Sequence, residues 1–387
     1  MRNILRKTPL AWRQLMKEKT RLAVAIAGIA FADMLIFIQM GFESALYDAA
    51  IKPHRSLNAD LVLINPQFKA LISVKNFSRD VLYKAASHNG VKSVNYIYAG
   101  TAQWRNPETR LERAILAWGI DPNQSPFQLP EIADGQDKIK QLNNVLFDQA
   151  GRPEYGDIGT LFRKQGKVNT ELNSKTVRVA GVFSNGASFA ADGNVVMSHS
   201  TYLQLFPENQ ANQISVGLIN LKPGVDAQEV QAELAKTLPI DVKVYTVEEF
   251  AQVEKKYWEA GTGIGFIFGL GTGVGFIVGI VIVYQILYSD VSDHLPEYAT
   301  LKAMGYTDLY LLWVLFQESI FLAVLGFIPG LIISLGLYQL TFAATMLPIA
   351  MNIQRAITVW IMTVIMCTFS GAIAMRKLSS ADPAEIF

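Results

Sequence analysis

The sequence predicts a membrane protein with four transmembrane α-helices, one and then three, and a large α+β extracytoplasmic domain inserted between helices 1 and 2. Three observations predict this class. Of the 387 residues, 51% are hydrophobic and only 17% are charged, whereas soluble domains carry about 25% charged residues. The apolar residues are concentrated at both ends of the chain. The mean hydropathy is only +0.23, which favours membrane spans joined to a polar domain over a pure helical bundle.

Four segments are apolar and long enough to cross a bilayer. A span needs about 20 residues, because about 30 Å of hydrocarbon is crossed at about 1.5 Å per residue. The third segment contains Pro329, but dividing it there would leave two pieces that are each too short. The first segment is longer than the apolar core of a signal peptide, so we interpret it as a retained signal anchor. The predicted spans are 22–41, 263–287, 309–340 and 356–375.

Basic residues predict the orientation of these spans. The lead 1–21 is rich in Arg and Lys, and the positive-inside rule places it in the cytoplasm. Four spans return the tail 376–387 to the same side, where Arg376 and Lys377 agree. We therefore expect the domain 42–262 and a short loop 341–355 outside, and the loop 288–308 inside.

The external domain shows alternating strand and helix patterns. Its apolar, β-branched runs are bounded by Gly, Asn and Pro, which is typical of strands. These runs are 61–64, 94–98, 114–118, 177–182 and 215–221. Helices are predicted at 78–87, at 226–238 with Asp226 as N-cap, and at 246–260, where Thr246 and Glu249 form a capping box.

One segment of this domain, 181–194, is rich in small and turn residues. The simpler interpretation is a surface loop. The sharper one is a loop that contacts an adaptor or another partner. Its candidate contact residues are Asn185, Gly186, Asp192 and Gly193.

The sequence contains no pattern that indicates catalysis, a metal or a cofactor. Its one cysteine, Cys367, and its four scattered histidines do not occur at metal-ligand spacing. No nucleophile elbow is present, and the glycine-rich run near the second span lacks the Gly-Lys-Ser/Thr of a phosphate loop. The net charge of +1 argues against a nucleic-acid partner.

The glycines of the second span recur every four residues in two rows. Such spacing lets helix backbones approach closely in lipid, either within one subunit or across a dimer interface, and the spacing does not choose between them. One row comprises Gly261, Gly265, Gly269 and Gly273, and the other comprises Gly271, Gly275 and Gly279. The candidate packing residues are Gly265, Gly269, Gly273, Gly275 and Gly279.

Two ionisable residues fall inside predicted spans, where charge is costly and often functional. Asp33 lies midway along the first span. It could pair with a polar group on a neighbouring helix or line a wet crevice. Glu318 lies in the cytoplasmic part of the third span, close enough to the interface for solvation at a helix end to explain it.

The cytoplasmic segments are too short to form an ATPase domain, but they can form contact surfaces. Residues 5–19 place Leu5, Trp12, Leu15 and Met16 near one helical face surrounded by basic residues, which predicts an amphipathic helix on the membrane surface. The loop 288–308 contains LPEYATLKAMGYTD, which predicts a short helix that Gly305 terminates.

This loop and the third span, EYATLKAMGYTDLYLLWVLFQESIFLAVLGFIPG, resemble the signature of MacB-type (FtsX-like) ABC transporter permeases. The first helix and span resemble the family as well, as does the tail through Asp382, Pro383 and Glu385. The external sequence GVFSNGASFAADGNVVMSHSTYLQLFP is most similar to the DevC-type branch, the permeases of the cyanobacterial DevBCA exporter. The positions that match the loop signature are Glu297, Leu301, Lys302, Ala303, Gly305, Glu318 and Gly326.

The resemblance implies a homodimeric permease in the inner membrane, in contact with lipid. A separate DevA-like ABC ATPase would bind the ATP and dock on the amphipathic helix and the loop. The domain outside would work with a DevB-like adaptor and a TolC-like outer-membrane channel, with the helix 246–260 linking its motion to the second span. The residues assigned to ATPase coupling are Glu297, Leu301, Lys302, Ala303, Met304, Gly305, Trp12, Leu15 and Met16.

Several functions remain open at the level of sequence. The first is export of a glycolipid or other amphiphile. The second, within the same family, is lipoprotein release or the control of cell-wall hydrolases. A third, from another class, is a membrane sensor that binds a ligand outside, although the small cytoplasmic segments argue against autonomous signalling. An anchored hydrolase is disfavoured because no nucleophile arrangement is present.

Overall fold

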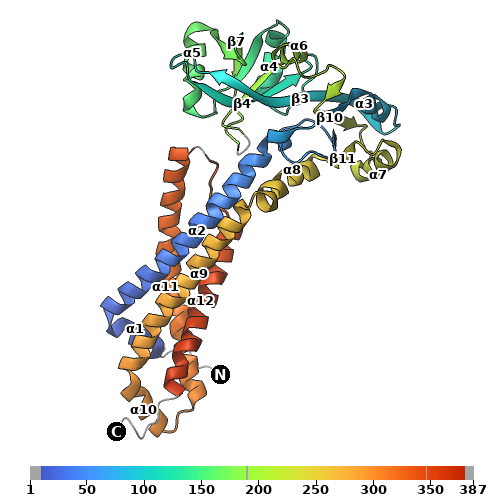
Figure 1. The fold of residues 1–387 in the computed structure, drawn as a ribbon. Helices are drawn as coiled ribbons and strands as arrows, with labels where there is room; N and C mark the ends of the chain where they lie inside the picture. The colour runs from blue at the N-terminus through green and yellow to red at the C-terminus, as the bar shows by residue number, and fades with distance from the viewer. Residues whose placement is uncertain (1–9, 189–190, 346, 380–387) are drawn as a thin grey trace. The chain divides into compact units, whose positions relative to one another are not determined.

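The computed structural model describes residues 10–188, 191–345 and 347–379, and its contacts divide the chain into two compact units (Figure 1). The membrane unit comprises Met1–Ala45, Ile264–Thr345 and Ile349–Phe387. The strand unit comprises Leu46–Gly263 with Met346–Pro348.

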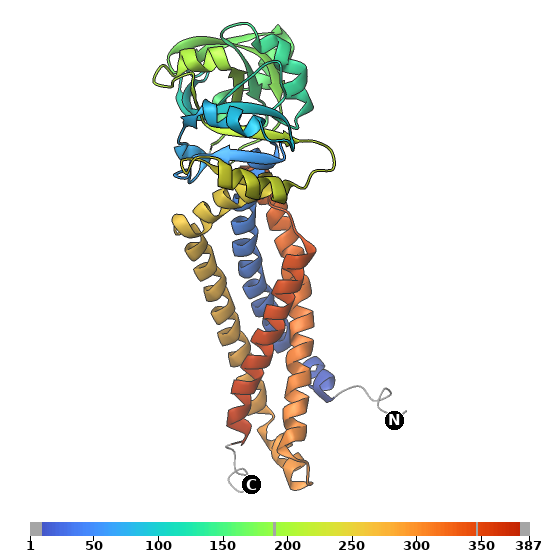
Figure 2. The same cartoon turned by 90° about the vertical axis from the view of Figure 1, so that its right-hand side faces the viewer.

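The membrane unit is helical, and its long helices run side by side (Figure 2). Four helices contain candidate spans, at Lys19–Arg55, Ile264–Asp293, Trp313–Thr345 and Ile353–Ala374, which confirms the predicted arrangement of one span and then three. The helices of this unit are α1 (Leu10–Lys17), α2 (Lys19–Arg55), α9 (Ile264–Asp293), α10 (Leu295–Ala303), α11 (Asp308–Thr345) and α12 (Ile353–Ser379).

Two of these helices extend beyond the predicted spans. α2 continues past residue 41 to Arg55, with Pro53 in its last turn, and α9 continues past residue 287 to Asp293. Both extensions are polar sequence, which an apolar-length criterion does not count. The extension of α9 has a consequence for function, because it places Asp290 on a membrane helix instead of in a loop.

Small residues let the helices of the membrane unit approach closely. Ala25, Ile29 and Ala32 of α2 are buried against α9, α11 and α12. A Cβ atom at Gly326 of α11 would lie 2.5 Å from the Cβ of Ile29, so only glycine fits there without a shift of α2. This contact gives a packing reason for one glycine of the loop-and-span signature.

The strand unit is built on a nine-stranded mixed sheet in the order β11-β1-β10-β3-β4-β8-β5-β7-β6. β6 also pairs with β3, so the six strands from β3 to β6 close into a ring. The nine strands are β11 (Lys243–Thr246), β1 (Leu61–Ile64), β10 (Val216–Leu221), β3 (Val91–Arg105), β4 (Glu112–Ile120), β8 (Asn194–Ser198), β5 (Asn144–Asp148), β7 (Lys175–Phe183) and β6 (Val168–Leu172).

Both faces of this sheet are buried, as adjacent residues of the same strand show. Val145 and Leu146 of β5 belong to opposite core clusters, and so do Val195 and Val196 of β8. Strands buried on both faces read as continuous apolar runs instead of alternating ones. This burial explains why the runs at 61–64, 94–98, 114–118 and 215–221 coincide with strands, whereas the run at 177–182 lies on β7, where buried residues alternate with exposed or half-buried ones.

Helices and a small second sheet cover the main sheet. β2 (Phe77–Ser78) pairs with β9 (Gln213–Ile214). The predicted caps are present: the Asp226 side chain accepts from the backbone N–H of Gln228, and Thr246 and Glu249 form the capping box. The α-helices are α3 (Arg79–Ala86), α4 (Pro130–Ile139), α5 (Ile158–Gln165), α6 (His199–Leu205), α7 (Ala227–Thr237) and α8 (Val247–Lys256).

Candidate functional site

Charged residues from distant parts of the sequence meet at one end of the membrane unit, where α1, the start of α2, the end of α9 and α10 lie together. The Nζ atom of Lys17 is 3.4 Å from Oε1 of Glu297, and both side chains are more than half exposed. The guanidinium of Arg21 contacts Asp293 and lies 2.9 Å from Oε2 of Glu18. Such exposed pairs contribute little stability, but they mark where α1 meets α10 and where α2 meets α9.

Apolar contacts anchor α10 more firmly than these ion pairs. Leu295 and Leu301 of α10 pack on Val291 of α9 and Leu315 of α11, both of which are fully buried. A displacement of α10 would therefore act directly on two membrane helices.

Gly305 ends α10, as the sequence predicts. Its φ is +90°, a backbone conformation that glycine adopts without the penalty of a Cβ atom. The backbone N–H of Tyr306 donates to the carbonyl oxygen of Leu301 at 3.1 Å, which is the long hydrogen bond of a glycine C-cap. Met304 beside it is 63% exposed, and the side chains of Lys302 and Ala303 lie outside the described residues.

α1 packs against the bundle. The Trp12 ring meets Phe321 of α11 edge-on, with centroids 5.5 Å apart, and Leu15 packs with the buried cluster of the membrane unit. Met16 is exposed, and Leu5 lies outside the described residues. Of the three predicted docking residues on this helix, the structure leaves Met16 on the surface and turns Trp12 and Leu15 toward α11.

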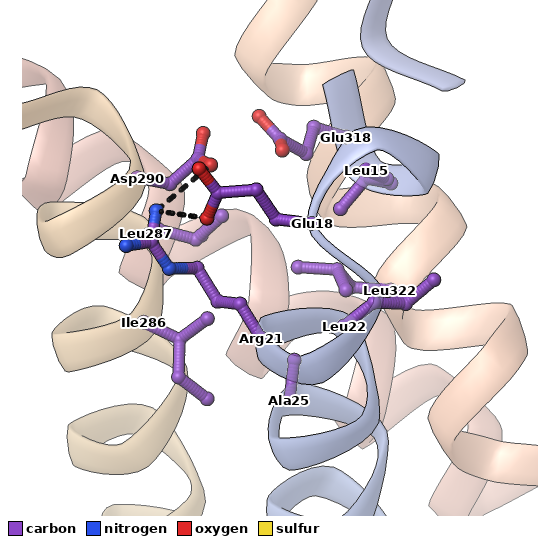
Figure 3. Close-up of a pocket in the computed structure, with 10 residues that line it drawn as sticks. All are labelled: Leu15, Glu18, Arg21, Leu22, Ala25, Ile286, Leu287, Asp290, Glu318 and Leu322. Carbon is purple, nitrogen blue, oxygen red and sulfur yellow. Dashed lines mark ion pairs between the residues drawn. The ribbon is translucent and has the colours of Figure 1, made fainter. Parts of the chain in front are cut away.

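A small cavity of about 10 Å³ lies among the charged and apolar residues at this end (Figure 3). Glu318 of α11 lines it with an exposure of 0%, and neither of its carboxyl oxygens has a hydrogen-bond donor. The expected solvation at a helix end is therefore wrong: Glu318 is enclosed by α2, α9 and α11. The cavity is lined by Leu15, Glu18, Arg21, Leu22, Ala25, Ile286, Leu287, Asp290, Glu318 and Leu322.

Asp290 faces the same cavity from α9. Its Oδ1 atom is 3.7 Å from the Arg21 guanidinium and 3.5 Å from Nδ1 of His294, while its Oδ2 atom is buried without a hydrogen-bond partner. The sequence reasoning missed Asp290 and Arg21 because it placed the end of the helix at residue 287. A sign was present, since Asp290 and His294 are four residues apart and face each other only if the helix continues.

Asp33, the other predicted intramembrane acid, lies deeper in the bundle. It is fully buried, and its Oδ1 atom accepts a hydrogen bond of 2.7 Å from the Thr363 hydroxyl of α12. Its Oδ2 atom has no partner. Asp33 is thus paired with a polar group on a neighbouring helix, one of the two arrangements expected for it.

The glycines of α9 divide into two groups. A Cβ atom would contact Met366 and Ala32 at Gly279, Ile36 at Gly275, and Gln39 at Gly271, so this row packs inside the membrane unit. At Gly269 and Gly273 a Cβ atom would meet nothing within 4 Å, and Gly265 is half-buried in the same row. Gly275 and Gly279 therefore pack within one subunit, which is one of the two interpretations of their spacing, whereas the other row stays open.

The predicted partner loop of the strand unit is tied down by its own domain. Asp148 accepts hydrogen bonds from the backbone N–H groups of Asn185 and Gly186, and burial raises its pKa although these donors oppose the shift. Asp192 accepts from Arg113 at 2.8 Å and pairs with Arg152 at 2.8 Å. Gly193 is buried beside the Tyr155 ring. Among the described residues no group of His, Cys, Asp or Glu side chains is placed to hold a metal ion.

The four candidate spans and the mixed-sheet domain define a membrane protein with one large strand domain, and sequence-family models place it more closely. A model of the MacB-like periplasmic core domain matches residues 22–237, and a model of the FtsX-like permease C-terminal region matches residues 263–383. The first alone covers more than half of the 387 residues, so the chain belongs to the MacB-like, FtsX-like permease family. No curated protein sequence matches the chain.

Solved structures resemble the strand unit at low identity. The periplasmic region of MacB from Actinobacillus actinomycetemcomitans is 12% identical over 51% of this chain and 94% of its own, with a TM-score of 0.36. The extracellular domain of the noncanonical ABC-type transporter YknZ from Gram-positive bacteria is 11% identical over 49% and 99%, with a TM-score of 0.33. A permease domain from Porphyromonas gingivalis is 12% identical over 50% and 90%, with a TM-score of 0.29.

Proposed function

We propose that this chain is the permease subunit of an ATP-driven tripartite-type exporter and that α10 is its contact with a separate ABC ATPase. The observation that carries the proposal, beyond family membership, is the anchoring of α10. Leu295 and Leu301 fix it to Val291 and Leu315, while Glu297 is exposed and, among the described residues, pairs on the surface with Lys17 alone.

This geometry accounts for how ATP-driven closure would move the permease. A partner that pushes on α10 acts on α9 and α11 through the leucine contacts, and on α2 through Arg21 and Asp293. Three of the four spans would then move together. ATP itself would be bound by the partner, so this chain is a transport subunit and not an enzyme.

The finer features of the proposal follow the sequence similarity to the DevC-type branch. They are a DevA-like ATPase, a DevB-like periplasmic adaptor, a TolC-like outer-membrane channel, and a glycolipid or other amphiphile as cargo. The subunit would be a homodimer in the inner membrane, with both termini in the cytoplasm and the strand unit in the periplasm. The open glycine row at Gly269 and Gly273 supports an association of two copies.

A second candidate function, lipoprotein release or control of cell-wall hydrolases, is favoured by the match of residues 263–383 to the FtsX-like C-terminal region. The two functions differ in what co-purifies with the full-length chain. An ABC ATPase together with an adaptor and an outer-membrane channel supports export. An ATPase with a cell-wall hydrolase and no adaptor supports the second function, and recovery of no ATPase at all refutes both.

The role of α10 is tested by reversing one exposed charge. Glu297→Lys places a positive charge beside Lys17 and alters the surface of α10 without changing its half-buried leucines. Export driven by ATP should be lost, while the amount of protein in the membrane is unchanged. Glu131→Lys, an equally exposed reversal on α4 of the strand unit, is the matched control and should export normally. Normal export by Glu297→Lys would contradict this role.

A further inference from the structure

Glu318 is the most completely buried acid at the α10 end of the membrane unit. Its exposure is 0%, and neither carboxyl oxygen accepts a hydrogen bond from any N–H or O–H group. Its carboxyl group and that of Asp290 line the same small cavity (Figure 3). Two ionised carboxylates that face one cavity of this size would repel each other and could not form a hydrogen bond.

Among the side chains that the structure describes, the charged groups around the cavity do not neutralise Glu318. The start of α2 brings Arg21, whose guanidinium is already shared by three carboxylates, those of Glu18, Asp290 and Asp293. At the end of α9, His294 is directed toward Asp290. Lys17 of α1 pairs with Glu297 of α10 outside the cavity, and the charged side chain described on α12, Arg355, lies at the far end of that helix.

We infer that Glu318 holds a proton at neutral pH and donates it to Asp290, so that one carboxyl–carboxylate hydrogen bond joins α11 to α9. A buried carboxyl group without a counter-charge is more stable in its neutral form. Glu318 keeps the proton, and the ionised Asp290 accepts the hydrogen bond, because its carboxylate lies 3.7 Å from the positive charge of Arg21. One bound proton then gives a hydrogen-bond partner to one of the unpaired oxygens of Glu318 and to the unpaired Oδ2 of Asp290.

The cavity gives this proton a route for exchange. Its volume of about 10 Å³ is close to that of one water probe, and its lining brings Glu18 and Arg21, which are partly exposed, beside the buried pair. A single water there can relay the proton between Glu318 and the surface.

The position of the proton also suggests what it controls, a consequence that rests on the proposed function. α10 begins at Leu295, directly after the turn of α9 that carries Asp290. When the proton leaves, both carboxyls are charged, and the contact between α9 and α11 weakens beneath α10. Movement of α10 would then be transmitted less well to α11 at alkaline pH.

The proton is detected by infrared spectroscopy on the purified full-length chain in lipid nanodiscs, without ATP or partners. At neutral pH the wild-type spectrum should contain the carbonyl stretch of a protonated carboxyl group that is absent from Glu318→Gln and disappears as the pH rises. Glu297→Gln, at an exposed acid, must keep this band. Asp33→Asn removes a different buried carboxyl and must also keep it. If Glu318→Gln and wild type have the same carboxyl bands, the inference is overturned.

A second measurement does not depend on band assignment. If the folded chain binds this proton and the unfolded chain does not, the folding equilibrium constant falls as the pH rises. Above the usual pKa of Glu, about 4.3, the fall is up to about tenfold per pH unit. Wild type should show this slope relative to Glu318→Gln, and equal slopes would overturn the inference. If Glu318→Gln does not fold, the spectra of wild type and Asp33→Asn are compared instead. Loss of the carboxyl band at alkaline pH in both supports the inference, and its persistence overturns it.

Discussion

A buried acid in the strand unit allows a quantitative test of the fold. Glu254 of α8 is fully buried. Its Oε2 atom accepts the backbone N–H of Leu71 at 2.9 Å, and its Oε1 atom accepts the indole N–H of Trp258 at 2.8 Å. The His54 ring lies 3.4 Å from the same carboxyl group. Glu254 therefore joins the last turn of α2, the 3₁₀ turn at Leu71–Ser73 and the π-helical turn after α8.

Glu254→Ala removes the acceptor for both donors and leaves a void where the carboxyl group was. A buried donor that loses its partner costs about 1–3 kcal/mol, so two donors give about 2–6 kcal/mol. This is a large share of a typical domain stability of about 5–15 kcal/mol. Glu254→Gln keeps one acceptor oxygen and should lose about half as much. Glu259→Ala, an exposed neighbour, should change the stability by less than about 0.5 kcal/mol.

The assay is urea unfolding of the purified full-length chain in detergent, followed by the β-sheet signal in circular dichroism. Every strand that the structure describes belongs to the strand unit, so this signal reports that unit once the overlapping helix signal has been subtracted. The expected order of stability is wild type and Glu259→Ala, then Glu254→Gln, then Glu254→Ala. If Glu254→Ala unfolds at the same urea concentration as Glu259→Ala, the buried carboxyl does not hold these three segments together.

Three further predictions concern single positions. Burial lowers the pKa of His199 from 6.5 to about 4. The free energy of unfolding should therefore fall by up to roughly 3 kcal/mol as the pH drops from 6.5 to about 4. A His199→Gln variant that loses as much stability over this pH range would refute this. Gly279→Val must displace Met366 and should cost about 1–3 kcal/mol in thermal unfolding, whereas Gly273→Ala should not destabilise the chain. Gly305→Ala adds a Cβ atom to a residue whose φ is +90°, which costs about 1–2 kcal/mol of backbone strain. This variant should reduce the stimulation of a co-purified ATPase without lowering expression.

The fold was predictable from sequence where one physical signal dominates. Apolar length identifies the four spans, and continuous apolar runs identify strands buried on both faces. The capping box at Thr246 and Glu249 marks the start of α8 because the two side chains satisfy the free N–H groups of the first turn. The region between residues 130 and 205 was largely missed. Its helix α4 begins at Pro130 without a side-chain cap, and the paired strands β5 and β8 are only five residues long.

The candidate site was predictable only in part, because its properties depend on contacts between distant segments. The sequence identifies α10 and its stop at Gly305, which are local features. It does not show that Glu318 is enclosed, because that depends on how residues of α2 and α9 pack around α11. A residue near the end of a span can be solvated or buried, and only the packing of its neighbours decides.

The glycines of α9 illustrate how much geometry a sequence pattern already contains. Successive residues of an α-helix are about 100° apart, so rows offset by two residues lie about 200° apart, on nearly opposite faces. The row through Gly275 and Gly279 and the row through Gly269 and Gly273 cannot serve one interface. In the structure the first is filled by Ile36 and Met366, whereas a Cβ at Gly269 or Gly273 would meet none of the described residues within 4 Å. Association of two copies through this helix would therefore use Gly269 and Gly273 and leave the internal packing of the first row undisturbed.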